Sequence, residues 1–508
     1  MGIIKRQGLK SSIVNYAGVL IGVVFFNFVF PHLISAEHLG LINLLRSLMI
    51  IFSAIFSLGL GQTLLRYYLE WDEASLAKSY NRFAIKSTLI SLLVFVVIMV
   101  VFKASFLAYY QKQSPLFVPY YYYLIPLVIL YTFTGYLEMY SLVKMRTSVP
   151  AFLREIVNRV ILIVVFYLFI HHSISQDSFV WGFVLSYALP LLVLIVYVYK
   201  VLDFGTESDV KFRKRVALKE EMMYTGHMFL LITFSYIHNF LDGIIIPAFL
   251  GLEALGIYTP ALVLGQMIQV PYRAVALISI PVLREALVKN DIQKVETMNR
   301  QIAINLFLIG AFLFTLLVSN ADGIFGLIPA KFSAAKHVLI IVACGRLLDM
   351  AFGLNSEIIN YSKHYKAIMV FSGIMMAMTI LLNIILIPRF GLDGAAYAVS
   401  ISLVVFNLIK TTYIYRVLGF HCFSKQYLSI IIISGLILGL MYFIPFMQFV
   451  DHHMFLNACC NIAFRASIGG VLFLGAVYFL KVSEDLNHFI RLILSGKILK
   501  GGHRMEEL

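Results

Sequence analysis

Charged residues are scarce in this chain of 508 residues. They form 13% of the sequence, while hydrophobic residues form 61% and the mean hydropathy is +0.89. Soluble domains usually contain roughly 25% charged residues, and no polar stretch of this chain is long enough to fold into one. The composition therefore excludes a water-soluble globular protein and predicts one whose mass lies in a membrane.

Signals of catalysis and of bound groups are also lacking. The four cysteines have the spacing of neither a metal site nor a disulfide framework. No GxxxxGK[ST] phosphate loop is present, so ATP hydrolysis by this chain is not expected. The net charge of +14 is spread over short segments and forms no basic face, which argues against a nucleic-acid partner. We predict no catalytic residue, no cofactor and no metal ion.

What the sequence does contain is a series of apolar runs. A membrane-spanning helix needs about twenty mostly apolar residues. We therefore expect an all-α polytopic membrane protein with about fourteen transmembrane helices, surrounded by membrane lipids. The expected spans are residues 11–34, 40–61, 83–102, 118–142, 151–170, 178–199, 224–249, 255–282, 300–319, 335–358, 365–387, 394–416, 426–446 and 462–481.

The longest hydrophilic connection, at residues 203–221, divides these spans into six and eight. We expect two six-helix lobes followed by two additional helices. The expected parts are an N-terminal lobe at 1–200, a cytoplasmic linker at 201–223, a C-terminal lobe at 224–420, two further transmembrane helices at 421–482 and a cytoplasmic tail at 483–508.

The positive charges indicate how the spans are oriented, because lysine and arginine are retained on the cytoplasmic side of a membrane. With the N-terminus in the cytoplasm, 31 of the 40 Lys and Arg fall in cytoplasmic segments or adjoining helix ends, and five fall in outer segments. One missed span early in the chain would scramble this bias. Both termini are therefore expected in the cytoplasm.

An internal repeat is visible at an offset of 216 residues. The segment FPHLISAEHLGLI in the first half aligns without a gap with IPAFLGLEALGIY in the second half. Both copies fall at the turn after the first helix of a six-helix half. Since six is an even number, both halves would start on the same side of the membrane, as parallel repeats do. The identical pairs are Pro31 with Pro247, Glu37 with Glu253, Leu39 with Leu255, and Gly40 with Gly256.

Motifs around this repeat resemble those of a known family. ISAEHLGLINLL, SLGLGQTLLRYYLEW, DGIIIPAFLGLEALGIYTPALVL and LNIILIPRFGLDGAAYAVSIS resemble bacterial polysaccharide and oligosaccharide flippases of the MATE-like MOP superfamily, such as Wzx-like O-antigen translocases. The resemblance covers roughly residues 10–420. It implies two six-helix lobes around a central cavity and transport of a lipid-linked sugar across the bacterial inner membrane. The last two spans depart from the plain twelve-helix form and resemble fourteen-helix members, among them peptidoglycan-precursor flippases.

Three arginines, Arg46, Arg273 and Arg346, lie within predicted spans. Each would cost roughly 2.5 to 3.5 kcal/mol if it faced lipid, so we expect them to face water or a partner. Arginine suits a pyrophosphate head group because its planar fork donates two parallel hydrogen bonds to phosphate oxygens. We predict that these three arginines bind substrate phosphate in the cavity. For Arg46, an alternative is that it reaches the outer head groups.

Three acidic residues, Glu138, Asp242 and Asp349, also lie within predicted spans. Asp349 follows Arg346 by one turn, so the two are expected to share a helix face as a working site or as a structural pair. Asp242 follows His238 by four residues, which gives a titratable pair of the kind used for coupling to H+ or Na+. A pair that only packs helices is an equally good interpretation. Glu138 lies near the inner end of its span and could reach the cytoplasm.

Two other features of the last spans have structural interpretations. Arg465 lies near the start of its span and is expected to anchor it at the membrane interface. Gly435 and Gly439 form a GxxxG pattern, which predicts close packing against another helix.

The sequence favours a flippase for undecaprenyl-pyrophosphate-linked oligosaccharide that works by alternating access. Other polysaccharide-assembly proteins are expected among its partners. A MATE-like multidrug exporter is the alternative, because the charges within the spans are mixed and do not decide. A membrane enzyme acting on the same lipid-linked sugars is disfavoured, since every outer connection is shorter than about twenty residues.

Overall fold

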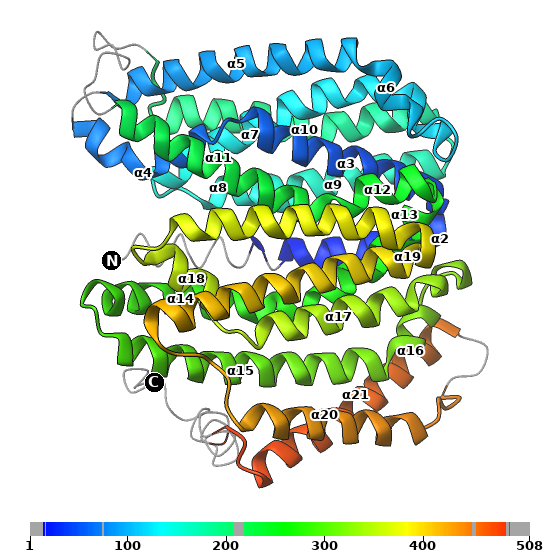
Figure 1. Cartoon of the computed structure of the whole chain (residues 1–508). Helices are drawn as coiled ribbons and strands as arrows, with labels where there is room; N and C mark the ends of the chain where they lie inside the picture. The colour runs from blue at the N-terminus through cyan, green and yellow to red at the C-terminus, as the bar shows by residue number, and fades with distance from the viewer. Residues whose placement is uncertain are drawn as a thin grey trace. The chain divides into compact units, whose positions relative to one another are not determined.

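The structure is a computed structural model that describes residues 14–15, 17–73, 76–206, 218–449, 454–483 and 487. Within these ranges the secondary structure is helical and contains no strand (Figure 1), which confirms the predicted all-α class. Residues 207–217 of the predicted linker and most of the predicted tail lie outside the described residues.

The helices of the first part of the chain are η1 (Val23–Val29), α2 (Phe30–Leu33), α3 (Ala36–Phe56), α4 (Leu60–Glu73), α5 (Ala77–Val101), α6 (Lys103–Ala108), η2 (Pro115–Tyr123), α7 (Leu124–Val143), α8 (Ser148–Phe152), η3 (Leu153–Val157), α9 (Asn158–Ile170) and α10 (Gln176–Val201). Those of the second part are α11 (Leu218–Phe240), α12 (Asp242–Phe249), α13 (Leu252–Gln266), η5 (Met267–Gln269), α14 (Val270–Val288), α15 (Ile292–Ser319), α16 (Ala321–Gly326), η6 (Ala330–Ala335), α17 (Lys336–Met350), α18 (Asn355–Tyr361), α19 (Lys366–Leu418), α20 (Gln426–Phe443) and α21 (Met454–Phe479).

The length and composition of these helices are those of a multi-pass membrane protein. Nine helices of the described chain are long and apolar enough to cross a membrane, or up to eleven if each of two bent pairs forms one span. The bent pairs are Lys219–Phe240 with Asp242–Phe249, at 43°, and Ala330–Met350 with Asn355–Tyr361, at 50°. Each predicted span overlaps a helix, but the number fourteen itself stays a prediction.

Helix α19 contains 53 residues and is interrupted at Gly391. A straight helix of that length would measure about 80 Å, far more than the roughly 30 Å of a bilayer core. Gly391 has φ 59° and ψ −132°, a backbone conformation that residues with a Cβ avoid. A Cβ on Gly394 would overlap the carbonyl oxygen of Leu386, so the chain doubles back here. The two arms correspond to the predicted spans at 365–387 and 394–416.

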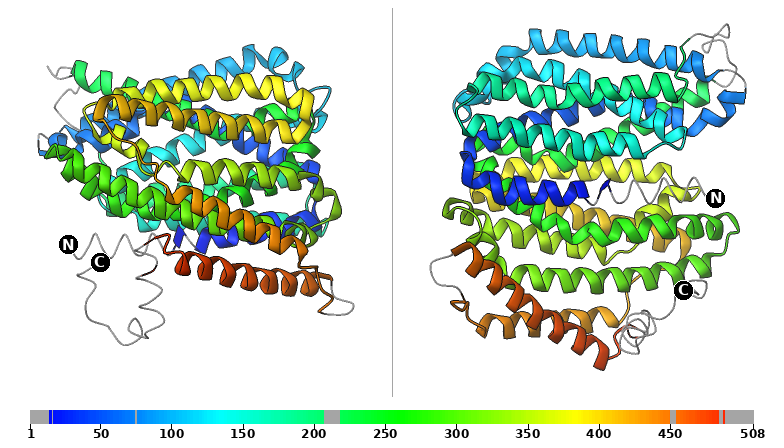
Figure 2. Two further views of the ribbon diagram at one scale, coloured as in Figure 1. Left: turned by 60° about the horizontal axis from the view of Figure 1, so that its bottom comes forward. Right: turned by 180° about the vertical axis from the view of Figure 1, so that it is seen from behind.

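The chain forms two compact units. Unit 1 consists of Met1–Pro260 and Ser372–Ala398, and unit 2 of Ala261–Phe371 and Val399–Leu508. In unit 1, α7 packs against α3, α4 and α10 (Figure 1). In unit 2, α15 packs against α14, α17, α20 and α21 (Figure 2). These units group residues by their contacts, whereas the predicted lobes group them by the sequence repeat. The lobe boundaries therefore stay a prediction.

In unit 1 the two copies of the sequence repeat meet at a pair of glycines. A Cβ on Gly40 would overlap the carbonyl oxygen of Leu252, and a Cβ on Gly256 would overlap that of Ala36. The repeat offset of 216 residues converts Ala36 into Leu252 and Gly40 into Gly256, so each contact is the repeat image of the other. Reciprocal contacts of this kind are the property of a two-fold arrangement. The helices α3 and α13 therefore meet at their N-terminal ends, at what we call the glycine crossing, while the parallel repeat itself stays a prediction.

A second crossing lies beyond the C-terminal end of α3. Here α4 meets α11 through side chains. Trp71 donates from Nε1 to Glu221 Oε1 at 3.0 Å, and the hydroxyls of Thr63 and Thr225 are 2.7 Å apart. Trp71 is 0% exposed and Glu221 is 2% exposed. We call this contact the polar crossing.

The GxxxG prediction for α20 is wrong. A Cβ on Gly435 or on Gly439 would meet nothing within 4 Å. In the part of the chain that the structure describes, neither glycine therefore lies at a close contact with another helix.

Candidate functional site

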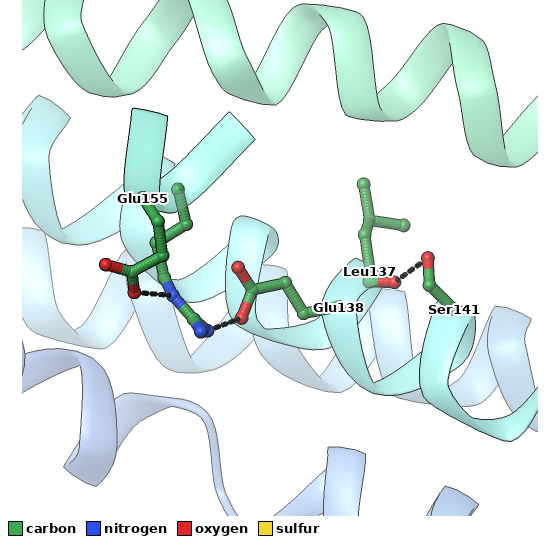
Figure 3. A network of polar contacts seen from close by, with 5 residues as sticks. Leu137, Glu138, Ser141 and Glu155 are labelled. Atoms are coloured by element: carbon green, nitrogen blue, oxygen red, sulfur yellow. Dashed lines mark hydrogen bonds and ion pairs between the residues drawn. The ribbon is translucent and has the colours of Figure 1, made fainter. Parts of the chain in front are cut away.

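A charged cluster in unit 1 joins α7 to η3 and α9. Arg154 donates from Nη1 to Glu138 Oε2 at 2.9 Å and from Nε to Glu155 Oε1 at 3.0 Å. Figure 3 shows the carboxylates of Glu138 and Glu155 on either side of this guanidinium. Arg159 donates from Nη2 to Glu155 Oε2 at 2.8 Å. Glu138, which we expected to reach the cytoplasm, thus forms an ion pair with Arg154.

The local backbone explains how these side chains gather. Residues Leu153–Val157 form a π-helical segment, and such segments are rare and frequent at functional sites. Two glycines before the other π-helical segment, η1, lie against the cluster. A Cβ on Gly22 would be 3.1 Å from Arg159 Cζ, and one on Gly18 would be 2.8 Å from its Nη1. Because Gly18 and Gly22 have no side chains, there is room for the guanidinium of Arg159 against this helix.

Arg46 of α3 belongs to the same neighbourhood. Its side chain is exposed, and its charge acts on Arg159, Tyr131 and Tyr187. The two tyrosine rings lie with centroids 6.1 Å apart in an edge-to-face arrangement. With Arg154 and Arg159 this makes three guanidinium groups against the two carboxylates of Glu138 and Glu155. The arginine cluster, as we call these five residues, has an excess positive charge that suits an anion.

The predicted titratable pair of unit 1 lies at the break between α11 and α12. His238 Nδ1 and Thr379 Oγ1 are 2.8 Å apart, and Asp242 Oδ2 accepts a hydrogen bond from Tyr258 at 2.7 Å. His238 is 3% exposed and Asp242 is 4% exposed. His238 and Asp242 each therefore have a hydrogen-bonding partner on another helix.

The predicted pair of unit 2 is bridged by a glutamine. Arg346 donates from Nη1 to Gln269 Oε1 at 3.0 Å, and Gln269 donates to Asp349 Oδ2. Asn407 donates to Asp349 Oδ1 at 2.6 Å. The carboxylate of Asp349 is thus held by two amides, and Arg346, 7% exposed, lies inside unit 2.

The same network continues across the break between α17 and α18. Tyr272 donates to Glu357 Oε2 at 2.8 Å, and Lys410 donates from Nζ to Ser356 Oγ at 2.7 Å. Asn299 accepts a hydrogen bond from the backbone N–H of Leu354 at 2.8 Å. Asn299 of a neighbouring helix therefore satisfies a backbone N–H that the break releases, which is the condition for irregular backbone inside a membrane.

The remaining two arginines differ from each other. Arg273 of α14 is exposed. Arg465 is 4% exposed and donates to the carbonyl oxygens of Ile444, Ser319 and Met441. The prediction of Arg465 as an interfacial anchor is wrong, because its guanidinium is turned inward to satisfy carbonyls at the ends of α15 and α20.

Arg154, Arg159 and Lys410 were not predicted from the sequence because they were counted with the cytoplasmic helix ends, and Glu155 and Glu357 were overlooked within the predicted spans. The signal was their position: Lys410, for example, lies two turns inside α19, which ends at Leu418. In the part of the chain that the structure describes, no group of three or more His, Cys, Asp or Glu could hold a metal ion.

Membrane spans that break at buried charged side chains are the architecture of secondary transporters. The described chain shares this feature at the α11–α12 and α17–α18 breaks. The chain belongs to the polysaccharide biosynthesis protein family, whose model matches residues 4–287. This confirms the resemblance noted in the sequence.

Individual relatives agree with this family. The chain is 28% identical over 185 residues to the probable low-salt glycan biosynthesis flippase Agl15 of Haloferax volcanii, an alignment that covers 35% of this chain. The chain spans 38% of the length of that curated relative.

Solved structures show the fold. The lipid II flippase MurJ in an inward closed conformation superposes with a TM-score of 0.69 at 15% identity, covering 93% of this chain and 99% of that one. An inward-facing multidrug resistance MATE transporter of the MOP superfamily superposes with a TM-score of 0.63 at 14% identity, covering 79% and 93%. The predicted MATE-like fold is confirmed.

Proposed function

We propose that this protein is a flippase that moves undecaprenyl-pyrophosphate-linked oligosaccharide from the cytoplasmic to the outer leaflet. The family and the fold support a lipid-linked glycan as substrate. The observation that carries the proposal is the arginine cluster of unit 1, where three guanidinium groups face two carboxylates. An excess of positive charge suits the pyrophosphate of such a lipid and repels the drug cations that a multidrug exporter carries.

The proposed orientation places both termini in the cytoplasm of a bacterium, with the chain in the inner membrane. It rests on the bias of 31 to 5 in Lys and Arg. In this orientation the glycine crossing lies at the outer side and the polar crossing at the cytoplasmic side. The predicted lobes, 1–200 and 224–420, would then open the two crossings in turn, which is alternating access.

Within the arginine cluster, Arg46 is the proposed first contact of the phosphate. Its side chain is exposed, and no ion pair holds it among the described residues. Arg154 and Arg159 are held by Glu138 and Glu155, which fix their forks and leave their remaining N–H groups for phosphate oxygens. In unit 2, the exposed Arg273 is the other proposed phosphate contact.

For Arg346 the burial and the bond to Gln269 favour the structural interpretation. Removing Arg346 alone should leave the half-buried Asp349 without its nearest guanidinium and destabilise the protein by up to about 3 kcal/mol. The double variant Arg346→Met with Asp349→Leu should recover most of this stability. Thermal unfolding in detergent, measured beside glycan export, tests this. A stable double variant that no longer exports would return Arg346 to the list of phosphate-binding residues.

The coupling ion is proposed to be H+ or Na+, with His238 and Asp242 as the candidate site in unit 1. Both residues are buried at a helix break, where transporters commonly bind their coupling ions. Other polysaccharide-assembly proteins are proposed partners on the basis of the family alone.

The test of the proposed function uses a strain from which the gene is deleted. We expect loss of surface polysaccharide and accumulation of lipid-linked oligosaccharide in the membrane, both reversed by the wild-type gene. Arg46→Gln should reduce export at least tenfold at equal protein level, whereas Arg389→Gln, at another exposed arginine, should not. Restored resistance to cationic drugs without any change in surface polysaccharide would favour the MATE-like exporter instead.

A further inference from the structure

A helix break in unit 2 places a buried lysine near two carboxylates. Asp349 lies in the last turn of α17 and Glu357 in the first turn of α18, on either side of the 50° bend. Lys410 of α19 is 3% exposed, and its hydrogen bond to Ser356 Oγ brings the ammonium to the first turn of α18. A lysine this deep in a spanning bundle is costly unless negative charge compensates it.

Negative charge is concentrated at this break. Asp349 and Glu357 are the acidic residues whose charges act on Lys410. The C-terminal end of α17 adds the negative end of a helix dipole. Arg346 supplies one positive charge, linked to Asp349 through Gln269. Without Lys410, two carboxylates would face one guanidinium, and one negative charge would remain uncompensated inside the unit.

Such an arrangement is one that transporters use to hold a metal cation. Broken spans bind Na+ with carboxylates, hydroxyls and the C-terminal ends of half-helices, and hard cations prefer oxygen ligands. Here the oxygens belong to Asp349, Glu357 and Ser356, and the phenol of Tyr272 orients the carboxylate of Glu357. The break therefore has the composition of a cation site.

The ammonium of Lys410 does not form an ordinary ion pair. Among the described residues Ser356 accepts its one hydrogen bond, and neither carboxylate forms an ion pair with it within 4.0 Å. Its Nζ lies 4.1 Å from the centroid of the Phe406 ring, a cation–π contact. The hydroxyl of Ser356 and the ring face of Phe406 thus hold the ammonium of Lys410, and the charges of Asp349 and Glu357 act on it without a direct ion pair.

We propose that Lys410 is a tethered cation, whose ammonium takes the place of a monovalent metal ion at the α17–α18 break. This break accordingly binds no Na+, and transport does not depend on Na+ at this site. The inference goes beyond the proposed function, whose candidate coupling site is at His238 and Asp242 of unit 1, because the site here is defined by Lys410, Asp349 and Glu357. Its test therefore measures Na+ binding and not transport.

The experiment uses the full-length protein purified in detergent and heated in NaCl or in choline chloride at equal ionic strength. All proteins compared also carry Asp242→Asn, which removes the candidate sodium site of unit 1, and wild type here denotes this background. The wild-type protein should unfold at the same temperature in both salts. Lys410→Met exposes the negative charge of the break, so Na+ should raise its unfolding temperature over choline by on the order of 5 °C at saturation. Radioactive sodium should be retained by this variant and not by the wild type.

Two controls isolate the site. Lys366→Met removes an exposed lysine from the start of the same helix and should respond to neither salt. Lys410→Met combined with Asp349→Asn should lose the sodium response, because one carboxylate charge is gone.

Three results would overturn the proposal: sodium-specific stabilisation of the wild type, a folded Lys410→Met variant that is indifferent to sodium, or failure of that variant to fold in both salts. The last would show that a metal ion cannot replace the ammonium. None of these results involves flipping, so they leave the flippase proposal standing. Conversely, a deletion strain with normal surface polysaccharide would refute the flippase and leave the sodium result intact.

Discussion

The two crossings of unit 1 hold neighbouring helices together by opposite means. At the glycine crossing, Gly40 and Gly256 contribute no side chain, and the backbones of α3 and α13 touch directly. At the polar crossing, α4 and α11 are joined by directional bonds, Trp71 to Glu221 and Thr63 to Thr225. A backbone contact at two glycines cannot accommodate an added side chain. A contact made by side-chain hydrogen bonds can accommodate a change in side-chain volume, but not the loss of a hydrogen-bond donor.

The difference also bears on opening. When the polar crossing separates, water can take over its hydrogen bonds, so the net loss is modest. When the glycine crossing separates, only van der Waals contacts are lost, each worth about 0.1–0.2 kcal/mol. Both contacts are therefore tight when closed and inexpensive to open, which is what a protein that alternates between two open states requires.

The glycine crossing should be the more sensitive to substitution. Gly40→Leu places a side chain where the Leu252 carbonyl lies, and we expect it to destabilise this closed arrangement by about 3 kcal/mol. Because the contact is reciprocal, Gly256→Leu should have an equal effect, and the double variant should cost less than the sum. Thermal unfolding in detergent measures all three.

The matched control is Gly435→Leu, since a Cβ at this glycine meets nothing within 4 Å. Its unfolding temperature should equal or exceed that of the wild type, because leucine favours a helix more than glycine does. If Gly40→Leu were as stable as this control, the close contact at the glycine crossing would be disproved.

At the polar crossing, the largest expected loss follows Trp71→Phe. The ring keeps its packing, but the buried carboxylate of Glu221 loses a donor, which costs about 1.5 to 3 kcal/mol for a charged group. Trp181→Phe, at a tryptophan that is 50% exposed, is the control and should have little effect. A double-mutant cycle with Glu221→Leu measures the coupling; additive effects would show that the indole and the carboxylate do not interact.

Thr63→Val should have the smallest effect. It removes one hydroxyl from the pair, while Thr225 still donates to the carbonyl of Glu221 at 2.7 Å. We expect a loss of about 0.5 to 1 kcal/mol in unfolding free energy. Thr412→Val, whose exposed hydroxyl donates to its own helix, serves as the control. If Thr63→Val lowered the unfolding free energy more than Trp71→Phe does, the threonine pair would contribute more to this crossing than the indole–carboxylate bond.

The positions of the helices could be predicted from the sequence because a lipid solvent demands long apolar runs, and those runs are local. The glycine crossing was within reach for a different reason. The repeat paired Gly40 with Gly256, although it did not say that the two would touch. The polar crossing was out of reach, since Trp71 and Glu221 are 150 residues apart and the motif that ends at Trp71 does not indicate its partner.

The charged clusters were predicted in part. Arg46, Glu138, Arg346 and Asp349 stood out because each interrupts an apolar run. Their partners did not stand out: Arg154 and Lys410 lie nearer to span ends, where a charge is ordinary, and Gln269 is uncharged. Hydropathy can identify a charge inside a membrane, but only the packing of helices shows which group compensates it.

The chain has only two tryptophans, and they lie in contrasting surroundings. Trp71 is fully buried against Tyr80, and their ring centroids are 4.3 Å apart. Trp181 is half exposed, and its ring centroid is 4.9 Å from that of Tyr123. With Trp181 replaced by phenylalanine, the remaining indole would be a single emitter located at the polar crossing. Its emission should shift to longer wavelength whenever that crossing opens to water, so the protein carries an optical reporter for the proposed alternating access.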